Sequence, residues 1–259
     1  MPLIGCDCAV CRSNDPRDRR ARPSILIDLK PDEARPSAAT RSRSASDTRY
    51  VLVDTSSDLR AQALAYGVGR VDAILFTHSH ADHVFGLDEV RRYNHLQKAP
   101  IPCYADAATA TDLRRTFAYV FDGTADTGGG VPRLLLSEIV GAFTLGGQGV
   151  VPVPVMHGAR QILGFRLGSF AYLTDCNEIP DSSWPLLTGV DTLVLDALRE
   201  RPHPTHFTVR QAVAAAARVG ASRTYLTHMS HDLSHADTCA RLPAGVTLAY
   251  DGQIVDVTG

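Results

Sequence analysis

An α/β fold, in which helices cover β-sheets, is what this sequence predicts. Short apolar runs of strand length recur along the 259 residues, and stretches with helical spacing of apolar residues lie between them. The chain shows no internal repeat and no obvious linker, and 44% of its residues are apolar, enough for a sizeable core. We therefore expect a single domain over residues 1–259.

The first half of the chain is expected to alternate strands and helices. Strands are predicted at 24–29, 50–54, 71–76 and 101–104, and helices at 59–66, 87–96 and 107–120. A loop that is cysteine-rich and then charged precedes them at 5–22. Residues 31–49 are rich in Ser, Arg, Ala and Pro and lack apolar periodicity, which indicates a flexible insertion.

The second half continues this alternation. Strands are predicted at 150–155, 162–167, 170–174, 192–196 and 223–227, and an Ala-rich helix at 209–219. The tail, 246–257, predicts a hairpin that turns at Asp251-Gly252.

Composition argues against several classes of partner. The net charge of -2 gives no support to a broad nucleic-acid or membrane-surface patch. No apolar run is long enough for a transmembrane helix, and the N-terminus lacks the charged and apolar regions of a signal peptide. Three of the six cysteines crowd into residues 6–11, a spacing more typical of metal ligation than of disulfides. We therefore expect a protein of the reducing cytoplasm.

Three histidines and an aspartate follow the predicted strand 71–76 within a few residues. They are His78, His80, Asp82 and His83. Clustered imidazole and carboxylate groups favour a divalent metal such as zinc or manganese. His78 and His80 alternate, so they can share one side of an extended segment. Asp82 and His83 are adjacent and must diverge, which suits a second metal beside the first.

Three more polar residues follow predicted strands, at points where loops gather at one edge of a sheet. They are His157, Asp175 and His228. Each of them alone is more often a structural residue than a ligand. A site for two metals needs more than four ligands, however, and together with the histidine cluster these residues supply them.

The series His78-x-His80-x-Asp82-His83, then His157, Asp175 and His228, resembles the ligand motifs of the metallo-β-lactamase superfamily of hydrolases. The resemblance implies an αββα sandwich with a two-metal site at one sheet edge. It assigns one metal to His78, His80 and His157. It assigns the other metal to Asp82, His83 and His228, and it makes Asp175 a bridge between the two.

Two further residues match motifs of that superfamily. Asp54, at the end of the strand 50–54, corresponds to its first acidic motif, which implies that Asp54 supports the ligand loop without touching the metals. His206 precedes the helix 209–219, like the histidine that protonates the leaving group in the phosphodiesterase branch. His203 is the local alternative for that acid. Asp82 joins His206 as a residue on which catalysis would depend.

The cysteines narrow the resemblance further. The stretch Gly5-Cys6-Asp7-Cys8-Ala9-Val10-Cys11, with His231 downstream, is similar to the branch that contains the phosphodiesterase of the bacterial carbon–phosphorus lyase (phosphonate) pathway. Three cysteines and one histidine hold a structural zinc in that branch, which implies the same role for Cys6, Cys8, Cys11 and His231. Three reduced cysteines beside a surface histidine, without metal, are the alternative.

The resemblance implies a hydrolase that cleaves a small cyclic or nucleotide-like phosphodiester with two zinc or manganese ions, plus one structural zinc. Nucleic-acid and membrane partners are not expected, and a homodimer is compatible with the sequence. Three alternatives share the superfamily: a tRNA 3′-processing endonuclease, a thioester hydrolase and a non-catalytic cofactor-biosynthesis protein. The chain lacks the long basic arm of the nuclease. It also keeps all seven ligands, which the non-catalytic members tend to lose.

Overall fold

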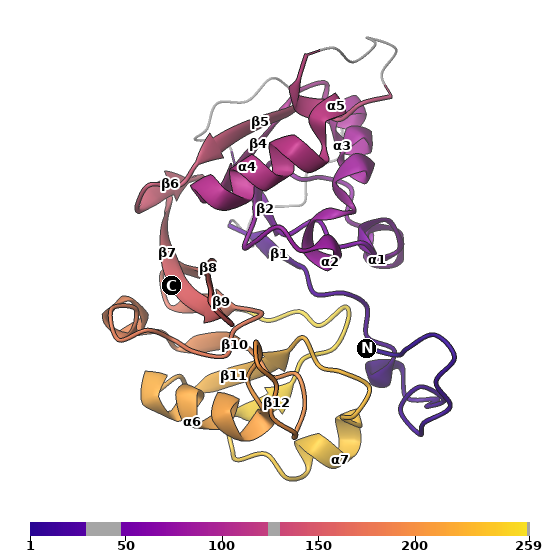
Figure 1. Ribbon diagram of the computed structural model, residues 1–259, viewed down its shortest axis with the longest axis vertical. Coiled ribbons are helices and arrows are strands. Elements are labelled where there is room, and N and C mark those ends of the chain that lie inside the picture. Colours follow the sequence, from indigo (N-terminus) through magenta and orange to yellow (C-terminus); the bar gives the residue numbers. More distant parts are fainter. Residues whose placement is uncertain (30–47, 124–129, 258–259) are drawn as a thin grey trace. The chain divides into compact units, whose positions relative to one another are not determined.

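The computed structural model describes residues 1–29, 48–123 and 130–257. The chain forms two compact units, a continuous unit, Arg22–Gly149, and a discontinuous unit made of Met1–Ala21 and Val150–Gly259. Figure 1 labels the helices and strands of both. Each unit contains its own sheet of parallel and antiparallel strands. The prediction of a single domain over 1–259 stays a prediction.

The sheet of the continuous unit has the strand order β1-β2-β3-β4-β5. Its strands are β1 (Ile25–Asp28), β2 (Tyr50–Val53), β3 (Ala73–Leu75), β4 (Ile101–Ala105) and β5 (Leu134–Glu138). β1 is antiparallel to β2, whereas β2 to β5 run parallel. The carboxyl ends of β2 and β3 therefore meet at one edge of the sheet. Asp54 follows the first of these ends, and the histidine-rich loop 77–83 follows the second.

Helices accompany this sheet. They are α1 (Leu59–Tyr66), α2 (Ala81–Val84), α3 (Arg91–Gln97), α4 (Ala107–Thr116) and α5 (Ala118–Phe121), with a 3-10 turn, η3, at Leu87–Val90. Asp106 caps α4 by accepting the N–H of Thr109 at 2.7 Å, which fixes where that helix begins. Side chains from helices and strands share one apolar core that includes Ile74, Phe76 and Leu113.

The sheet of the discontinuous unit runs in the order β12-β11-β10-β9-β8-β7. Its strands are β7 (Gln148–His157), β8 (Arg160–Leu167), β9 (Phe170–Leu173), β10 (Thr192–Asp196), β11 (Arg223–Thr227) and β12 (Val246–Leu248), and β6 (Phe143–Leu145) precedes β7 in the chain. β9 to β12 are parallel, and β8 is antiparallel to both β7 and β9. β7, β9, β10 and β11 therefore end at the same edge. Four polar residues stand at these ends: His157, Asp175, Asp196 and His228.

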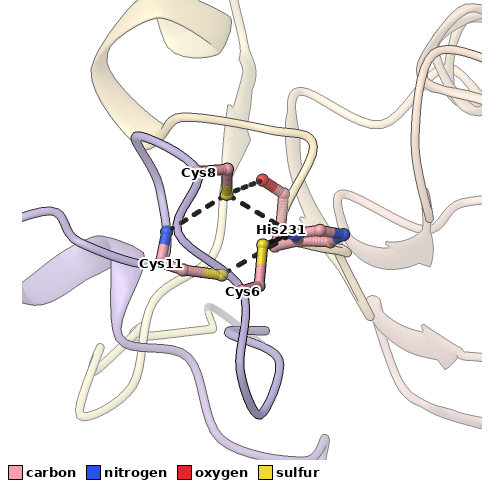
Figure 2. A group of neighbouring side chains, drawn as sticks. All are labelled: Cys6, Cys8, Cys11 and His231. Atoms are coloured by element: carbon pink, nitrogen blue, oxygen red, sulfur yellow. Dashed lines mark hydrogen bonds between the residues drawn. The ribbon is translucent and has the colours of Figure 1, made fainter.

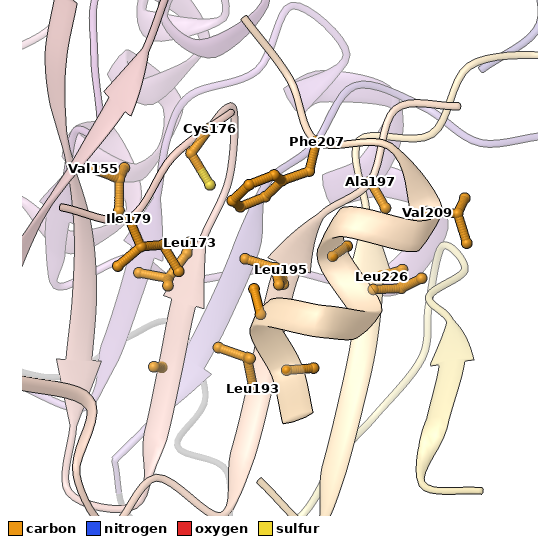
Figure 3. Close-up of a cluster of buried hydrophobic side chains, with 14 of the residues drawn as sticks. Val155, Leu173, Cys176, Ile179, Leu193, Leu195, Ala197, Phe207, Val209 and Leu226 are labelled. Atoms are coloured by element: carbon orange, nitrogen blue, oxygen red, sulfur yellow. The ribbon is translucent and has the colours of Figure 1, made fainter. Parts of the chain in front are cut away.

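Helix α6 (Val209–Val219) packs on β10 and β11 through an apolar face that includes Ala212 and Ala216. Figure 3 shows the buried side chains of this core, among them Leu195, Phe207 and Leu226. A capping box between Thr208 and Gln211 starts the helix. Gly220, in the left-handed region at φ 78°, ends it. The remaining elements are the 3-10 turns η1 (Pro16–Asp18) and η4 (Trp184–Leu187) and the short helix α7 (His235–Cys239).

Some expectations from the sequence are wrong, and one lies almost wholly outside the described residues. The predicted hairpin at 246–257 is wrong, because β12 pairs in parallel with β11 and residues 249–257 form no strand. The insertion expected at 31–49 lies outside the described residues except for Thr48 and Arg49, which are both buried. The predicted helices 87–96 and 107–120 are each divided, the first into η3 and α3 and the second into α4 and α5. Throughout the described ranges, we find no helix with both the length and the apolar character to cross a membrane.

Candidate metal-binding sites

The loop after β3 gathers three histidines in the continuous unit. The ring of His78 lies 4.6 Å from that of His80 and 4.2 Å from that of His83, measured between ring centroids. His78 and His83 are fully buried, whereas His80 is exposed at the start of α2. Burying two imidazoles side by side costs free energy unless each has polar partners or a metal. The two buried imidazoles of this loop therefore need polar partners or a metal.

Asp54 fixes this loop from behind. Its carboxylate accepts hydrogen bonds from the Thr77 amide, the Thr77 hydroxyl and His83 Nδ1, each at 2.8 Å. Burial raises the pKa of Asp54, while the neighbouring His83 and the Thr77 donors act in the opposite direction. Asp54 also adopts the left-handed region at φ 62°, which is uncommon for a residue with a side chain. These contacts fit the supporting role that the motif implies.

The hydrogen bonds of this loop select one nitrogen of each buried imidazole for a metal. His83 uses Nδ1 toward Asp54 at 2.8 Å. His78 uses Nδ1 toward the Thr77 hydroxyl at 3.0 Å, and that hydroxyl itself donates to Asp54. In each ring, Nε2 is thus the nitrogen whose lone pair suits ligation.

A second group of candidate ligands lies at the strand ends of the discontinuous unit. His228 Nε2 stands 3.3 Å from Asp175 Oδ2, a separation that two ligands of one metal adopt. His157 Nδ1 bonds to the carbonyl oxygen of Thr205 at 3.0 Å, which leaves Nε2 as its ligating nitrogen. Asp175 and His228 have φ angles of 54° and 59°. Backbone strain of this kind is concentrated at functional sites.

His206 lies among these ligands. Its Nδ1 is 3.0 Å from Asp196 Oδ1, and the other Asp196 oxygen accepts the Phe207 amide at 2.9 Å. Its ring stacks on that of His228, with 4.7 Å between centroids and 11° between planes, and lies 4.9 Å from the ring of His157. Asp175, His206 and His228 can each offer a ligand atom within 4.8 Å of the others. Geometry alone therefore allows His206 to be a ligand as well as an acid.

Asp196 is a residue of this candidate site that the sequence did not predict. It is fully buried, and this burial raises its pKa well above the ordinary value, while His228 pulls it down. The sequence signal that could have found it is its position at the end of an apolar strand. Asp54 and Asp175 lie one and two residues beyond the ends of their strands. His203, the alternative acid, lies beside His206. Its ring is 5.0 Å from that of His206, and its Nδ1 contacts the Thr205 amide at 3.3 Å.

The four cysteine-cluster residues converge as the sequence suggested, and Figure 2 shows them around the ring of His231. The distances from His231 Nδ1 to the sulfur atoms of Cys6, Cys8 and Cys11 are 3.2, 3.4 and 3.6 Å. Ligands on one tetrahedral zinc, with bonds of about 2.3 Å to sulfur and 2.0 Å to nitrogen, stand about 3.5 Å apart. The donor set and its spacing therefore fit a closed zinc site.

The environment of Cys8 favours its metal-binding thiolate form. A hydrogen bond from the Cys11 amide at 3.4 Å, followed by the contact with His231, lowers the pKa of Cys8 to about 6. Cys103 and Cys176 are buried in apolar surroundings, and burial raises the pKa of each. All six cysteines are free. Cys8, unlike Cys103 and Cys176, thus has the surroundings of a metal ligand.

Comparison with known proteins agrees with this picture. A family model described as the beta-lactamase superfamily domain matches residues 49–229. A crystal structure described as a new diphosphatase from the PhnP family is 42% identical, over 100% of this chain and 93% of that one, with a TM-score of 0.86. Zn²⁺-bound PqqB from Methylobacterium extorquens is 20% identical over 99% of this chain and 95% of that one, with a TM-score of 0.67. At that identity the likeness concerns the fold alone.

A curated relative from Porphyromonas gingivalis (strain ATCC BAA-308 / W83), named octanoyltransferase, is 33% identical over 265 residues. The match covers 100% of this chain but 50% of the relative, so the chain spans about half the length of that protein. The family match and the full-length likeness to the PhnP-family structure confirm the α/β fold class. The chain belongs to the metallo-β-lactamase superfamily and lies near the PhnP family within it.

Proposed function

We propose that the chain is a metal-dependent phosphodiesterase with a dinuclear centre. The proposed ligands are His78, His80, Asp82, His83, His157, Asp175 and His228, with zinc or manganese as the metal. The support is that each unit gathers its share of these residues at the carboxyl edge of its sheet, with tautomers suited to ligation. The 42% identity to a diphosphatase over the whole chain points the same way.

In the proposed reaction, the metals and the protein residues have different tasks. Two bound ions would supply Lewis acidity and a water of lowered pKa, the usual contribution of such a pair to phosphoester hydrolysis. The chain's own part is to hold the ions and to protonate the leaving oxygen. We assign that proton to His206, whose Nδ1 bonds to Asp196, so that Nε2 delivers it. The Asp196 carboxylate would stabilise the imidazolium before transfer.

The Asp196–His206 pair is the observation that carries this proposal. A hydrolase of esters with poor leaving groups needs an acid beside its metals, and His206 stacks on the proposed ligand His228 at 4.7 Å between centroids. A glyoxalase-type thioesterase expels a thiolate, which leaves without a proton and has no need of such a pair.

Asp175→Ala tests the proposal. The variant should hold less metal and lose turnover to the background rate, because the carboxylate is assigned to both ions. The assay is hydrolysis of bis(p-nitrophenyl) phosphate and of cyclic nucleotides, with metal content by mass spectrometry. Wild-type turnover in the variant would rule out the bridging role. A wild-type protein that cleaves thioesters but no phosphodiester would overturn the function itself.

A diphosphatase is the second candidate, because the neighbour at 42% identity bears that description. Cleaving a diphosphate expels a phosphate group that is a far better leaving group than an alkoxide. The same metals would suffice, and the acid would matter less. Comparing nucleoside diphosphate esters with cyclic phosphates, in wild type and His206→Ala, separates the two candidates.

We also propose that Cys6, Cys8, Cys11 and His231 hold a structural zinc. Cys8→Ser should release one zinc and lower the melting temperature, because a structural zinc contributes directly to folding. A loss of about 2 kcal/mol would lower the midpoint by several degrees in a chain of this size. Metal analysis and calorimetry provide the readout, with Cys239→Ser, a partly buried cysteine outside the cluster, as the matched control. Unchanged zinc content and melting temperature in Cys8→Ser would mean that no zinc sits there.

The surroundings of the protein belong to the same proposal. Six free cysteines suit a reducing compartment, and we propose the cytoplasm. The proposed partner is a small phosphodiester. The homodimer stays a prediction, which light scattering of the purified chain would test.

A further inference from the structure

Arg22 makes an ion pair with one of the proposed metal ligands. Its Nη1 lies 3.0 Å from Asp82 Oδ2, within the continuous unit. The side chains are 42% and 23% exposed, so the pair is partly solvated. An ion pair in such a setting adds little to folding stability. Its effect should therefore be sought in what it does to Asp82.

The backbone of Arg22 is held in place on both sides. Its N–H donates to Asp58 Oδ2 at 2.8 Å, and its carbonyl oxygen accepts from Gln62 Nε2 at 2.8 Å. The Ser56 hydroxyl fixes Gln62 in turn, at 2.7 Å. Three side chains around the start of α1 thus set the position from which the guanidinium reaches Asp82.

The oxygen that Arg22 contacts is the one nearest to a second ligand. Asp82 Oδ2 lies 4.0 Å from His83 Nε2. Because Asp54 engages His83 Nδ1, Nε2 is the ligating nitrogen of that ring. Two ligands with bonds of about 2.0–2.2 Å to one metal stand about 3–4 Å apart. Arg22 therefore pairs with the oxygen that would share an ion with His83.

We infer that Arg22 is a positioning residue. It orients the Asp82 carboxylate and weakens the binding of the metal shared by Asp82 and His83. The inference rests on the ligand set of the proposed function. The guanidinium competes with the metal for the negative charge of the Asp82 carboxylate, and its own positive charge repels the metal. A unit charge and a divalent ion about 5–6 Å apart in a water-like medium repel each other enough to change affinity about tenfold.

Titration of the metal-stripped protein with Mn²⁺, followed through the electron paramagnetic resonance of the free ion, tests the inference. Thiolate clusters prefer zinc to manganese, so the cysteine cluster does not interfere. Arg22→Gln should bind one Mn²⁺ about tenfold more tightly than wild type. The difference should shrink at high ionic strength, because salt screens partly exposed charges. Arg22→Lys should stay close to wild type.

Arg114→Gln is the matched control, since Arg114 forms a similarly exposed pair with Glu138 at 3.4 Å and changes the net charge equally. Mn²⁺ affinity that is equal or weaker in Arg22→Gln, or equally tightened in Arg114→Gln, would overturn the inference. Arg22→Lys tightening as much as Arg22→Gln would overturn it too. Absence of any phosphodiesterase activity would instead contradict the proposed function, because the Mn²⁺ titration does not depend on turnover.

Discussion

In each unit a buried aspartate lies within hydrogen-bond distance of the Nδ1 atom of a buried histidine. In the continuous unit Asp54 Oδ2 stands 2.8 Å from His83 Nδ1, and in the discontinuous unit Asp196 Oδ1 stands 3.0 Å from His206 Nδ1. Both aspartates are fully buried at the end of a strand, and burial raises the pKa of each. Chemically, the two pairs are nearly identical.

Their surroundings differ. His83 is 0% exposed, and its aspartate also binds the backbone and hydroxyl of Thr77 in the ligand loop. The second pair is less enclosed, with 9% of the His206 side chain exposed, and Asp196 binds one further backbone group. Under the proposed function, the first hydrogen bond would orient a metal ligand, and the second would prepare a proton donor. The proposed difference in role thus rests on the neighbours of each pair and not on the pair itself.

The largest effect is expected for His206→Ala, which removes the histidine of the second pair. Its metal content should match wild type, and its turnover of alkyl or sugar phosphodiesters should fall about 10²–10⁴-fold, the usual contribution of a general acid. For a nitrophenyl ester, whose leaving group is stable as an anion, the deficit should be much smaller. Loss of a metal, or equal deficits on both esters, would show that His206 ligates or positions substrate, and His203 would become the candidate acid.

Asp54→Asn should have the opposite signature. Removing a carboxylate that orients a ligand typically weakens metal affinity about 10–100-fold. Turnover at saturating metal should recover much of its wild-type value, because the ligands themselves remain. Competition with a coloured chelator gives the affinity. Undiminished affinity together with slow turnover at every metal concentration would remove the distinction between the two aspartates.

The smallest effect is expected for Asp196→Asn. An amide still accepts a hydrogen bond from Nδ1 but lacks the charge that supports an imidazolium. A charge-assisted bond exceeds a neutral one by about 1–1.5 kcal/mol, or about tenfold in rate. Without the carboxylate the pKa of the acid falls, so the alkaline limb of the pH–rate profile should move to lower pH. A profile that stays in place would assign Asp196 to packing.

Sequence patterns located the regular elements best where capping and periodicity agree. The helix predicted at 209–219 is α6 to the residue, because Thr208 and Gln211 cap its start and Gly220 ends it. β5 was not predicted, although it contains three consecutive leucines, since its pattern neither alternates nor contains β-branched residues. The tail was misread because Asp251-Gly252 is a turn signal, yet β12 takes its partner from β11, a contact that local sequence does not reveal.

The candidate site divides in the same way. Residues within the compact motif 78–83 could be predicted from their spacing alone. The more distant His157, Asp175 and His228 needed their places after predicted strands together with the resemblance to a known ligand order. Neither route reached Asp196, whose partner His206 is ten positions away. Nor could either find Arg22, whose contact with Asp82 spans 60 positions and belongs to no motif.

The cysteine cluster ties the two ends of the chain together. Cys6 and His231 are 225 positions apart, and Asp18 accepts the amide of His235, 217 positions away. On a ribosome that adds about 5–20 residues per second, about 10–45 s pass between the synthesis of Cys6 and that of His231. These cysteines are thus synthesised well before the histidine that completes the cluster. Until then the three clustered thiols stay open to oxidants and to foreign metals. Oxidation or capture of another metal in that interval would prevent the cluster from forming.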